Sequence, residues 1–571
     1  MIRGKQGQFV RGIGRGIAGV LATLVFAVLA QSAPSTSVTG LVRDADGPIA
    51  GATVRVKATA SATITGFDGR FVLAGLEPNN PVVLTAWARG YYIGGGDKEY
   101  LPGGADIEII LTRHCDRDNP DYTWLSAFSN AGYAGSGEDG NCENCHSDPN
   151  DAQTSLPFSE WQGDAHALSA QNVRFLTMYK GTDTTGNQSP RTQYFHSRDY
   201  GRIPLRPDPN TPYFGPGYKL DFPEAAGNCA TCHTPAAALD APYSTDPTTV
   251  TGVGAEGVAC DFCHKVWDTR TDPASGLPYA NMPGVLSFEF RRPPAGHQFF
   301  AGPLDDVAPG EDTYTPVQRQ SRYCAPCHFS AFWDTLVYNS FGEWLDSPYS
   351  NPVTGKTCQD CHMPAGLADH FARPDAGGLI RDPQTIFSHR MPGAADEALL
   401  HQAVSMEVTA EQQGQQVVVK VDITNDRTGH HVPTDSPLRH LILVVKALDA
   451  QGRLLQQSDG PVIPEWCGVG DPNEGWYAGL PGKAFAKVLE ELWTEVAPTG
   501  AYWNPTRVLS DNRIAALATD TSSYTFVGPR QGQVTVDVTL LFRRAFIDLA
   551  VQKGWEVRDI IMENEKLTVS P

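Results

Sequence analysis

The sequence predicts a multidomain α+β protein: a β-sandwich, then a loop-rich and helical central region, then a C-terminal β-sandwich-like domain. Three observations support this fold class. The 571 residues suffice for three or four domains, and 41% hydrophobic residues suffice for packed cores. Strand-like alternation of apolar and polar residues appears near both ends of the chain. Ten of the 12 cysteines lie in the centre, in one repeated pattern.

The charge of the chain excludes some partners. Lys and Arg total 44 against 64 Asp and Glu, which gives a formal net charge of −20 at pH 7. Such an acidic chain should repel nucleic acid and anionic lipid surfaces. We therefore expect no nucleic-acid partner.

Residues 1–30 have the features of a signal peptide. Their first half contains four basic residues and no acidic one: Arg3, Lys5, Arg11 and Arg15. The apolar run that follows, Ile17 to Ala30, is short for a membrane span, and its small residues predict cleavage after Ala30. An uncleaved anchor is the rival interpretation. No later stretch is apolar and long enough to span a membrane, so we expect a periplasmic, extracellular or cell-surface protein.

Residues 38–113 are predicted to form the small N-terminal β-sandwich. The segments Ala52–Val56 and Val82–Ala86 have the composition of short strands, and an Asp68-Gly69 turn precedes another. The strings GLVRDADGPIAGATV, TGFDGRFVLAGL and LTAWARGYY resemble a carboxypeptidase-regulatory-like domain, which is a transthyretin-type sandwich of seven strands. This resemblance implies a spacer, docking or surface-attachment role rather than catalysis.

The central region, residues 114–404, contains five copies of the motif Cys-x-x-Cys-His. Their residues are Cys142, Cys145 and His146; Cys229, Cys232 and His233; Cys260, Cys263 and His264; Cys324, Cys327 and His328; and Cys358, Cys361 and His362. This spacing is typical of c-type haem attachment, in which the two thiols bind the porphyrin covalently and the histidine binds the iron. Zinc and disulfide interpretations leave the histidine after each second cysteine unexplained. We therefore expect five covalently bound haem c groups organising this domain.

The distances between motifs along the chain suggest how the haems are grouped. Short segments join the second motif to the third and the fourth to the fifth, which predicts two close pairs within a conducting row. Between Pro204 and Pro316 the chain is rich in Pro and Gly and poor in periodicity. The porphyrins themselves are therefore expected to supply much of the apolar core there.

The sixth iron ligand distinguishes an electron carrier, whose irons are filled, from an enzyme with an open iron. Ten of the 15 histidines lie outside the motifs, which is enough to fill every iron. The strings WQGDAHA, GHQFF, SHRMPG and GHHVPT resemble distal-ligand segments of multihaem c-type cytochromes, the superfamily that includes the tetrahaem cytochromes of nitrifying bacteria. The resemblance implies that the distal ligands are His166, His297, His389 and His430.

The remaining histidines are assigned by position. His370, near the fifth motif, is a further ligand candidate, and His196 is held in reserve. His431 is expected to bond a propionate at most, His440 to be packed or at the surface, and His114 and His401 to be solvated. The segment after Gly429 resembles a GHxxPTG element, but Asp435 replaces its final Gly.

Residues 405–571 are predicted to form the C-terminal β-rich domain. Gln416–Ile423, His440–Leu448 and Val534–Phe542 have strand patterns, and a helix is predicted over Arg543–Val551. This region resembles the β domain that follows the haems in some multihaem cytochromes. Asp511 and Arg513 are expected to form a buried pair rather than to support a metal.

Two cysteines lie outside the motifs, Cys115 and Cys467. In an oxidising compartment they form either one disulfide between the central and C-terminal domains or two separate buried thiols. The sequence leaves both interpretations open.

These features predict a pentahaem cytochrome with mostly bis-histidine, low-potential haems, relaying electrons between redox proteins or to an extracellular acceptor. Assembly into an oligomer or filament is left open. The alternative is an oxidoreductase acting on a small nitrogen or sulfur compound at one open haem. Pentahaem nitrite reductases resemble the chain in haem number, but their catalytic motif usually carries Lys in place of His. Hydroxylamine-oxidising enzymes carry eight haems.

Overall fold

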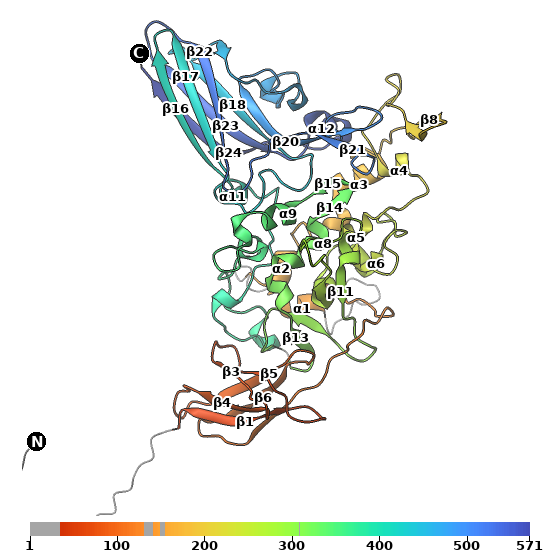
Figure 1. Cartoon of the computed structure of the whole chain (residues 1–571), viewed down its shortest axis with the longest axis vertical. Helices are drawn as coiled ribbons and strands as arrows, with labels where there is room; N and C mark the ends of the chain where they lie inside the picture. The colour runs from red at the N-terminus through yellow and green to blue at the C-terminus, as the bar shows by residue number, and fades with distance from the viewer. Residues whose placement is uncertain (1–34, 131–140, 149–154, 308, 571) are drawn as a thin grey trace, which may run out of the picture.

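The computed structural model describes residues 35–130, 141–148, 155–307 and 309–570. The predicted signal peptide, residues 1–30, lies outside the described residues. The N-terminal strands, the central region and the C-terminal sheets follow one another along the long axis of the molecule (Figure 1). Within the described ranges, no helix is long and apolar enough to span a membrane.

The N-terminal domain is a β-sandwich, as predicted. Its strands are β1 (Ser37–Arg43), β2 (Thr53–Val56), β3 (Ala62–Ile64), β4 (Arg70–Ala74), β5 (Val82–Trp87), β6 (Gly94–Tyr100) and β7 (Ile107–Ile110). They form one sheet of order β4-β1-β7 and another of order β3-β2-β5-β6, and Val38, Val54 and Leu84 contribute to the core between them. Gly40 allows β1 to lie against β7, because a Cβ at this position would lie 2.2 Å from the Ile107 carbonyl oxygen.

The described central region is loop-rich, and its helices are short. They are α1 (Cys142–His146), α2 (Pro157–Trp161), α3 (Val173–Lys180), α4 (Tyr218–Asp221), α5 (Ala230–His233), α6 (Pro235–Ala238), α7 (Cys260–Lys265), α8 (Ala325–His328), α9 (Ser340–Leu345), α10 (Cys358–His362) and α11 (Glu397–Leu400). The longest, α3, has eight residues. The predicted helical character of this domain is therefore not evident beyond these short helices. Helices this short are not stable without tertiary contacts.

Four two-stranded ribbons connect these helices. They are β8 (Tyr194–Ser197) with β9 (Gly201–Pro204), β10 (Val266–Thr269) with β11 (Phe288–Phe290), β12 (Phe300–Gly302) with β13 (Asp312–Tyr314), and β14 (Ser330–Phe332) with β15 (Thr335–Tyr338), within the described residues. The apolar side chains of the region form several small clusters rather than one core. Cys263 and Cys327 pack against one cluster and Cys260 against another, so these clusters lie at the predicted attachment motifs.

The C-terminal domain is a second sandwich. Its elements are β16 (Ser405–Gln413), β17 (Gln416–Thr424), β18 (His440–Leu448), β19 (Gln457–Asp459), β20 (Gly482–Glu491), β21 (Thr506–Asp511), β22 (Thr519–Val527), β23 (Val534–Arg543), α12 (Ile547–Lys553) and β24 (Ile560–Val569). The sheets have the orders β16-β17-β22-β19 and β21-β20-β18-β23-β24, and Val419, Leu443 and Val538 contribute to the core between them. All three strands predicted from the sequence are present.

The predicted C-terminal helix begins later than expected, at Ile547 instead of Arg543. Arg543 ends strand β23, and its buried guanidinium forms an ion pair with Asp559 at 2.6 Å. A buried cation is stable only when it is paired, so this contact keeps Arg543 in the sheet.

Cys115 and Cys467 are separate thiols rather than a disulfide. Cys115 packs beside Tyr92 and Phe299, whereas Cys467 is buried with Ile442 of strand β18. Of the two interpretations that the sequence left open, the structure therefore favours separate thiols, because the two cysteines belong to different apolar clusters.

An ion pair and a backbone hydrogen bond join the N-terminal sandwich to the central region. Arg55 of β2 forms an ion pair with Asp305 at 2.7 Å, and the backbone N–H of Ala58 donates to Asp306. Asp306 also binds Arg381 at 2.8 Å. Both aspartates therefore hold the sandwich against the central region.

Lys553 of α12 connects the C-terminal sandwich to the central region. Its buried ammonium donates to the carbonyl oxygens of Thr177 at 3.1 Å, Thr182 at 3.2 Å and Pro216 at 2.5 Å. We expect Lys553→Met to destabilise this junction by about 1–3 kcal/mol, because buried carbonyls lose their donor. The urea midpoint, followed by tryptophan fluorescence, should fall, whereas the exposed control Lys446→Met should leave it unchanged. Equal midpoints for the two variants would contradict this role.

Candidate functional site

Each Cys-x-x-Cys-His motif lies on a single short helix. Helices α1, α7 and α10 begin at the first cysteine of their motif, and α5 and α8 begin one residue after it. Residues three apart on a helix face the same side, so each pair of thiols is presented together. The histidine follows on the same turn.

All five motif imidazoles are held through Nδ1. The acceptors are the carbonyl oxygens of Phe371 for His146 (2.6 Å), Ser169 for His233 (3.1 Å), Ala301 for His264 (2.8 Å) and Pro392 for His362 (2.8 Å), and the Asp435 carboxylate for His328 (3.0 Å). Such a contact sets the tautomer and the ring orientation and leaves Nε2 free to bind a metal. The five motifs thus share one ligand geometry.

Burial keeps most of these imidazoles neutral, as metal binding requires. It lowers the pKa of His146 and His362, and it lowers the pKa of His233 and His264 to about 4. His328 differs from the others. Burial alone would lower its pKa, but the charge and hydrogen bond of Asp435 outweigh burial and raise the pKa.

Two predicted distal histidines face motif histidines. The ring centroids of His166 and His328 are 6.3 Å apart, and those of His430 and His362 are also 6.3 Å apart. A metal–imidazole bond is about 2 Å long, and the bonded nitrogen lies about 1.1 Å from the ring centre, so two imidazoles sharing one metal ion have centroids about 6 Å apart. The separation of both pairs therefore fits one iron between the two rings.

This separation differs from that of stacked rings. Phe175 lies parallel to His233 with a centroid distance of only 3.6 Å and an interplanar angle of 3°. The His362 and His430 rings are also nearly parallel, at 19°, but they lie much farther apart. Direct stacking thus does not explain the spacing of the facing histidines.

The other predicted distal ligands do not each face a single motif histidine as His166 and His430 do. His389 lies near His146 and His264, and burial, aided by His146, lowers its pKa to about 4. His370 is held through Nδ1 by the half-exposed Asp369 at 2.6 Å, and His297 is exposed. The assignment of these three histidines to particular haems stays a prediction.

His114 is not solvated, contrary to expectation. Its ring packs against Trp267 and Phe299 with centroid distances of 5.0 and 5.1 Å, and its buried Nε2 has no hydrogen-bond partner among the described residues. Aromatic side chains fill this domain boundary, which the sequence pattern did not indicate. A buried Nε2 without a partner is free to bind a metal, so His114 joins the candidates, and the Nε2 of His440 meets the same criterion among the described residues.

The other unassigned histidines agree better with the sequence analysis. His440 is fully buried in β18 beside Phe546, while His401 is exposed. His196 is exposed on β8. His431 approaches Glu343 at 3.7 Å.

Thiols of different motifs come close together. Cys142 lies within hydrogen-bonding reach of Cys260, Cys232 of Cys327, and Cys324 of Cys358. Each pair joins two motifs: the first with the third, the second with the fourth, and the fourth with the fifth. The last pairing agrees with the expected close pair of the fourth and fifth motifs. The first two pairings were not predicted. A short segment between two motifs limits how far apart they can lie, but it does not show which other motifs lie beside them.

The second and third motifs are also neighbours, as expected. Ala236, just after the second motif, and Phe262, within the third, belong to one apolar cluster. Gly284 lies at the same place, where a Cβ would lie 2.3 Å from the Thr231 carbonyl oxygen and 2.9 Å from the Cys232 thiol. The five motifs therefore form one connected group.

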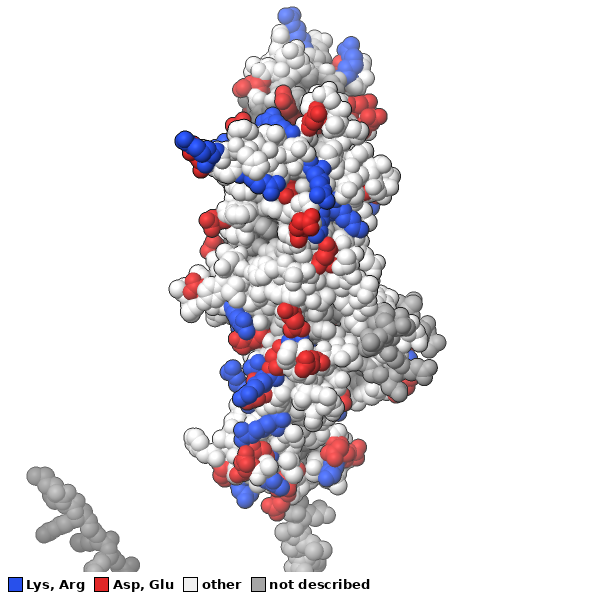
Figure 2. All heavy atoms as spheres, turned by 90° about the vertical axis from the view of Figure 1, so that its right-hand side faces the viewer, with Lys and Arg blue, Asp and Glu red and all other residues white. Residues whose placement is uncertain are grey.

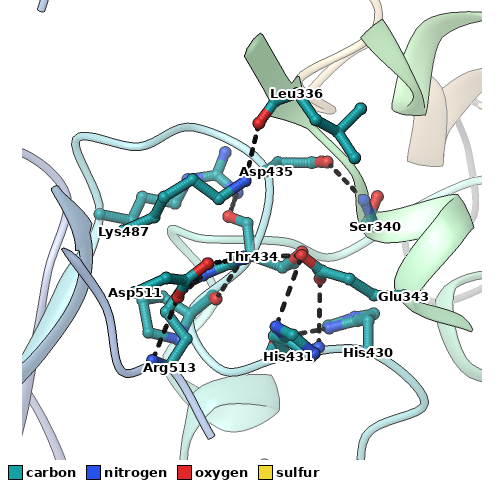
Figure 3. Close-up of polar contacts among 12 residues, drawn as sticks. Leu336, Ser340, Glu343, His430, His431, Thr434, Asp435, Lys487, Asp511 and Arg513 are labelled. Atoms are coloured by element: carbon teal, nitrogen blue, oxygen red, sulfur yellow. Dashed lines mark hydrogen bonds and ion pairs between the residues drawn. The ribbon is translucent and has the colours of Figure 1, made fainter. Parts of the chain in front are cut away.

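A buried charge network holds the loop that carries His430 and Asp435 against helix α9 (Figure 3). Glu343 accepts hydrogen bonds from Thr434 Oγ1 at 2.5 Å and from the Arg513 guanidinium at 2.7 Å. Arg513 also pairs with Asp511 at 2.7 Å, so the predicted pair forms, but only the Arg513 side chain is buried. The C-terminal domain thus positions residues at two motifs of the central region.

Sequence reasoning missed Asp164 and Asp435, the carboxylates that contact His166 and His328. The available signals were an Asp two residues before a ligand candidate and an Asp in place of a motif Gly. No group of three or more His, Cys, Asp or Glu side chains that could hold a bare metal ion occurs in the described part of the chain.

Residues 37–95 match the family of carboxypeptidase regulatory-like domains, as the sequence resemblance implied. The chain is similar to a penta-heme cytochrome c552 from Thermochromatium tepidum, with 20% identity over 75% of this chain and 97% of that one and a TM-score of 0.49. A PapD-like domain of human CEP192 is similar over 30% of this chain and 84% of its own length, with 8% identity and a TM-score of 0.12. No curated protein matches the chain.

Proposed function

We propose that the chain is an extracytoplasmic pentahaem c-type cytochrome that relays electrons between redox proteins or to an extracellular acceptor. The observation that carries this proposal is the set of five Cys-x-x-Cys-His turns, each with its histidine held through Nδ1. Two thiols and one imidazole on a single turn are the donors that haem c requires.

Haem c supplies reversible one-electron exchange at its iron. The residues of the chain supply covalent attachment, axial imidazoles and fixed ring orientations. His166 and His430 lie where they would complete the coordination at the fourth and fifth motifs. Filled axial positions favour electron transfer over substrate binding, and bis-histidine ligation favours low potentials.

The connected arrangement of the motifs supports a relay. The first motif adjoins the third, the third adjoins the second, the second adjoins the fourth, and the fourth adjoins the fifth. An electron entering at the haem of one motif would therefore reach any other haem by steps between neighbouring haems.

The surface and the N-terminal sequence support the proposed location and partners. The net charge of −20 favours encounters with basic redox proteins. Acidic and basic side chains are interspersed along the face shown in Figure 2. Export follows from the signal-peptide features of residues 1–30, and the N-terminal sandwich would serve as a spacer or docking domain.

A second candidate function is an oxidoreductase at the second motif. Tyr338 donates to Tyr502 at 2.5 Å, and both hydroxyls lie near Cys229. Burial raises the pKa of Tyr502 to about 12, so it stays protonated at neutral pH. Since Tyr338 donates its own proton to Tyr502, the Tyr502 hydroxyl is the one that would donate a hydrogen bond to a small nitrogen or sulfur compound.

Electron paramagnetic resonance of the oxidised protein tests these two functions. We expect only low-spin ferric signals, because the chain carries more histidines than its irons need. A stoichiometric high-spin signal from one haem would contradict the carrier and favour the enzyme. Tyr338→Phe supplies the comparison, since it should alter that signal only if the open iron belongs to the second motif.

A further inference from the structure

The two facing histidine pairs have the same separation but different surroundings. His362 and His430 both contact carbonyl oxygens through Nδ1, those of Pro392 at 2.8 Å and His431 at 2.9 Å. His328 and His166 instead both contact carboxylates. The fourth motif thus differs from the fifth in the charge behind its ligands.

Both carboxylates at the fourth motif are shielded from water. Asp435 lies 3.0 Å from His328 Nδ1, and its side chain is 14% exposed. Asp164 lies 2.7 Å from His166 Nδ1, and its side chain is 4% exposed. Coulombic interactions are stronger away from water, so these contacts should outweigh that of the exposed Asp369 with His370.

The backbone at Asp435 adopts a conformation that suits glycine. Its φ is +58°, in the left-handed region that favours glycine. This conformation is strained for a non-glycine residue, although less so for Asp than for most. Asp435 compensates through its carboxylate, which accepts from the Ser340 N–H at 3.3 Å (Figure 3) and also binds His328. A strained residue whose side chain makes buried contacts is the pattern found at functional positions.

Resting on the proposed function, we propose that Asp435 and Asp164 act as positioning residues that give the haem of the fourth motif the lowest potential of the five. Each carboxylate draws the Nδ1 proton toward itself, which makes the imidazole a stronger electron donor through Nε2. Their negative charges also favour the more positive, oxidised iron. The nearby Arg439 offsets part of the Asp435 charge.

Because of its position, the potential of this haem would affect electron passage between the second and fifth motifs. The fourth motif contacts both the second and the fifth through their thiols. Electrons moving between those two motifs must then cross the least easily reduced site. Asp435 and Asp164 would therefore control the rate of passage through this part of the relay.

Redox titration followed by optical and paramagnetic spectra tests the inference on the intact, haem-loaded protein. We expect Asp435→Asn and Asp164→Asn each to raise the potential of the same haem, the lowest of the five. At a fixed potential its ratio of reduced to oxidised form should rise about tenfold, which equals 59 mV for a one-electron couple. The double variant should shift this haem further.

Two additional variants make the result decisive. Asp435→Gly restores the residue favoured by the backbone, so it should fold well and still raise the lowest potential. Asp426→Asn removes an equal charge from an exposed site before the same loop. It should not shift the potential of any haem by a similar amount.

The two proposals fail in distinguishable ways. If Asp435→Gly and Asp164→Asn each carry five haems and the lowest potential is unchanged, this inference is overturned and the proposed function is not. A shift of two different haems by the two variants would also overturn it. An unmodified protein with fewer than five haems would overturn the proposed function instead.

Discussion

The Cys358→Ala, Cys361→Ala double variant should carry four covalently bound haems, and the unmodified chain should carry five. Both thiols project from helix α10, and no other pair with this spacing lies on the same turn. Without them a porphyrin has no covalent bond at this site, although His362 and His430 remain. Intact-mass spectrometry and the pyridine haemochrome spectrum measure the loss directly.

Cys115→Ala and Cys467→Ala provide matched controls, because both thiols lie outside the motifs. Each should retain five haems. If the natively matured protein shows no added porphyrin mass, the haem interpretation is wrong. The close thiols of different motifs would then have to be explained as reduced cysteines or disulfides.

His430→Ala should convert one haem from low spin to high spin. His430 faces His362 with a centroid distance of 6.3 Å, so removing its imidazole leaves one side of that iron without a protein ligand. The expected result is one high-spin ferric signal, accompanied by binding of an added small ligand such as imidazole. Paramagnetic resonance before and after the addition measures both effects.

His431→Ala is the matched control for His430→Ala. The adjacent imidazole does not face a motif histidine, and its backbone carbonyl, which holds His430 Nδ1, is kept. Its haems should all stay low spin. His430→Met should instead remain low spin with a raised potential, since Met ligation raises haem potentials. Unchanged spectra in His430→Ala would show that another residue ligates this iron.

Local patterns predicted the parts of this fold that depend on neighbours in sequence. The alternation in Gln416–Ile423 and Val534–Phe542 determines which side chains face a sandwich core, so these strands were predictable. The helix expected from Arg543 was displaced because Arg543 pairs with the distant Asp559. Its partner is set by the fold, and no local pattern indicates it.

The candidate site also has features that follow from local sequence and features that depend on the fold. Two thiols and an imidazole on one turn are a local arrangement, so the five attachment motifs could be recognised without the fold. His114 shows the opposite case, since residues distant in sequence bury it.

By itself the sequence determined which residues are predicted to bind haem covalently, because a Cys-x-x-Cys-His motif needs only five consecutive residues. Only the tertiary structure decided that His166 faces His328, that His430 faces His362, and that Asp435 lies behind one of these ligands. Each of these contacts joins segments far apart in the chain. The contacts of His430 and Asp435 form because the C-terminal domain packs against helix α9 through Glu343, whereas His166 and His328 meet within the central region. No spacing along the sequence specifies either packing.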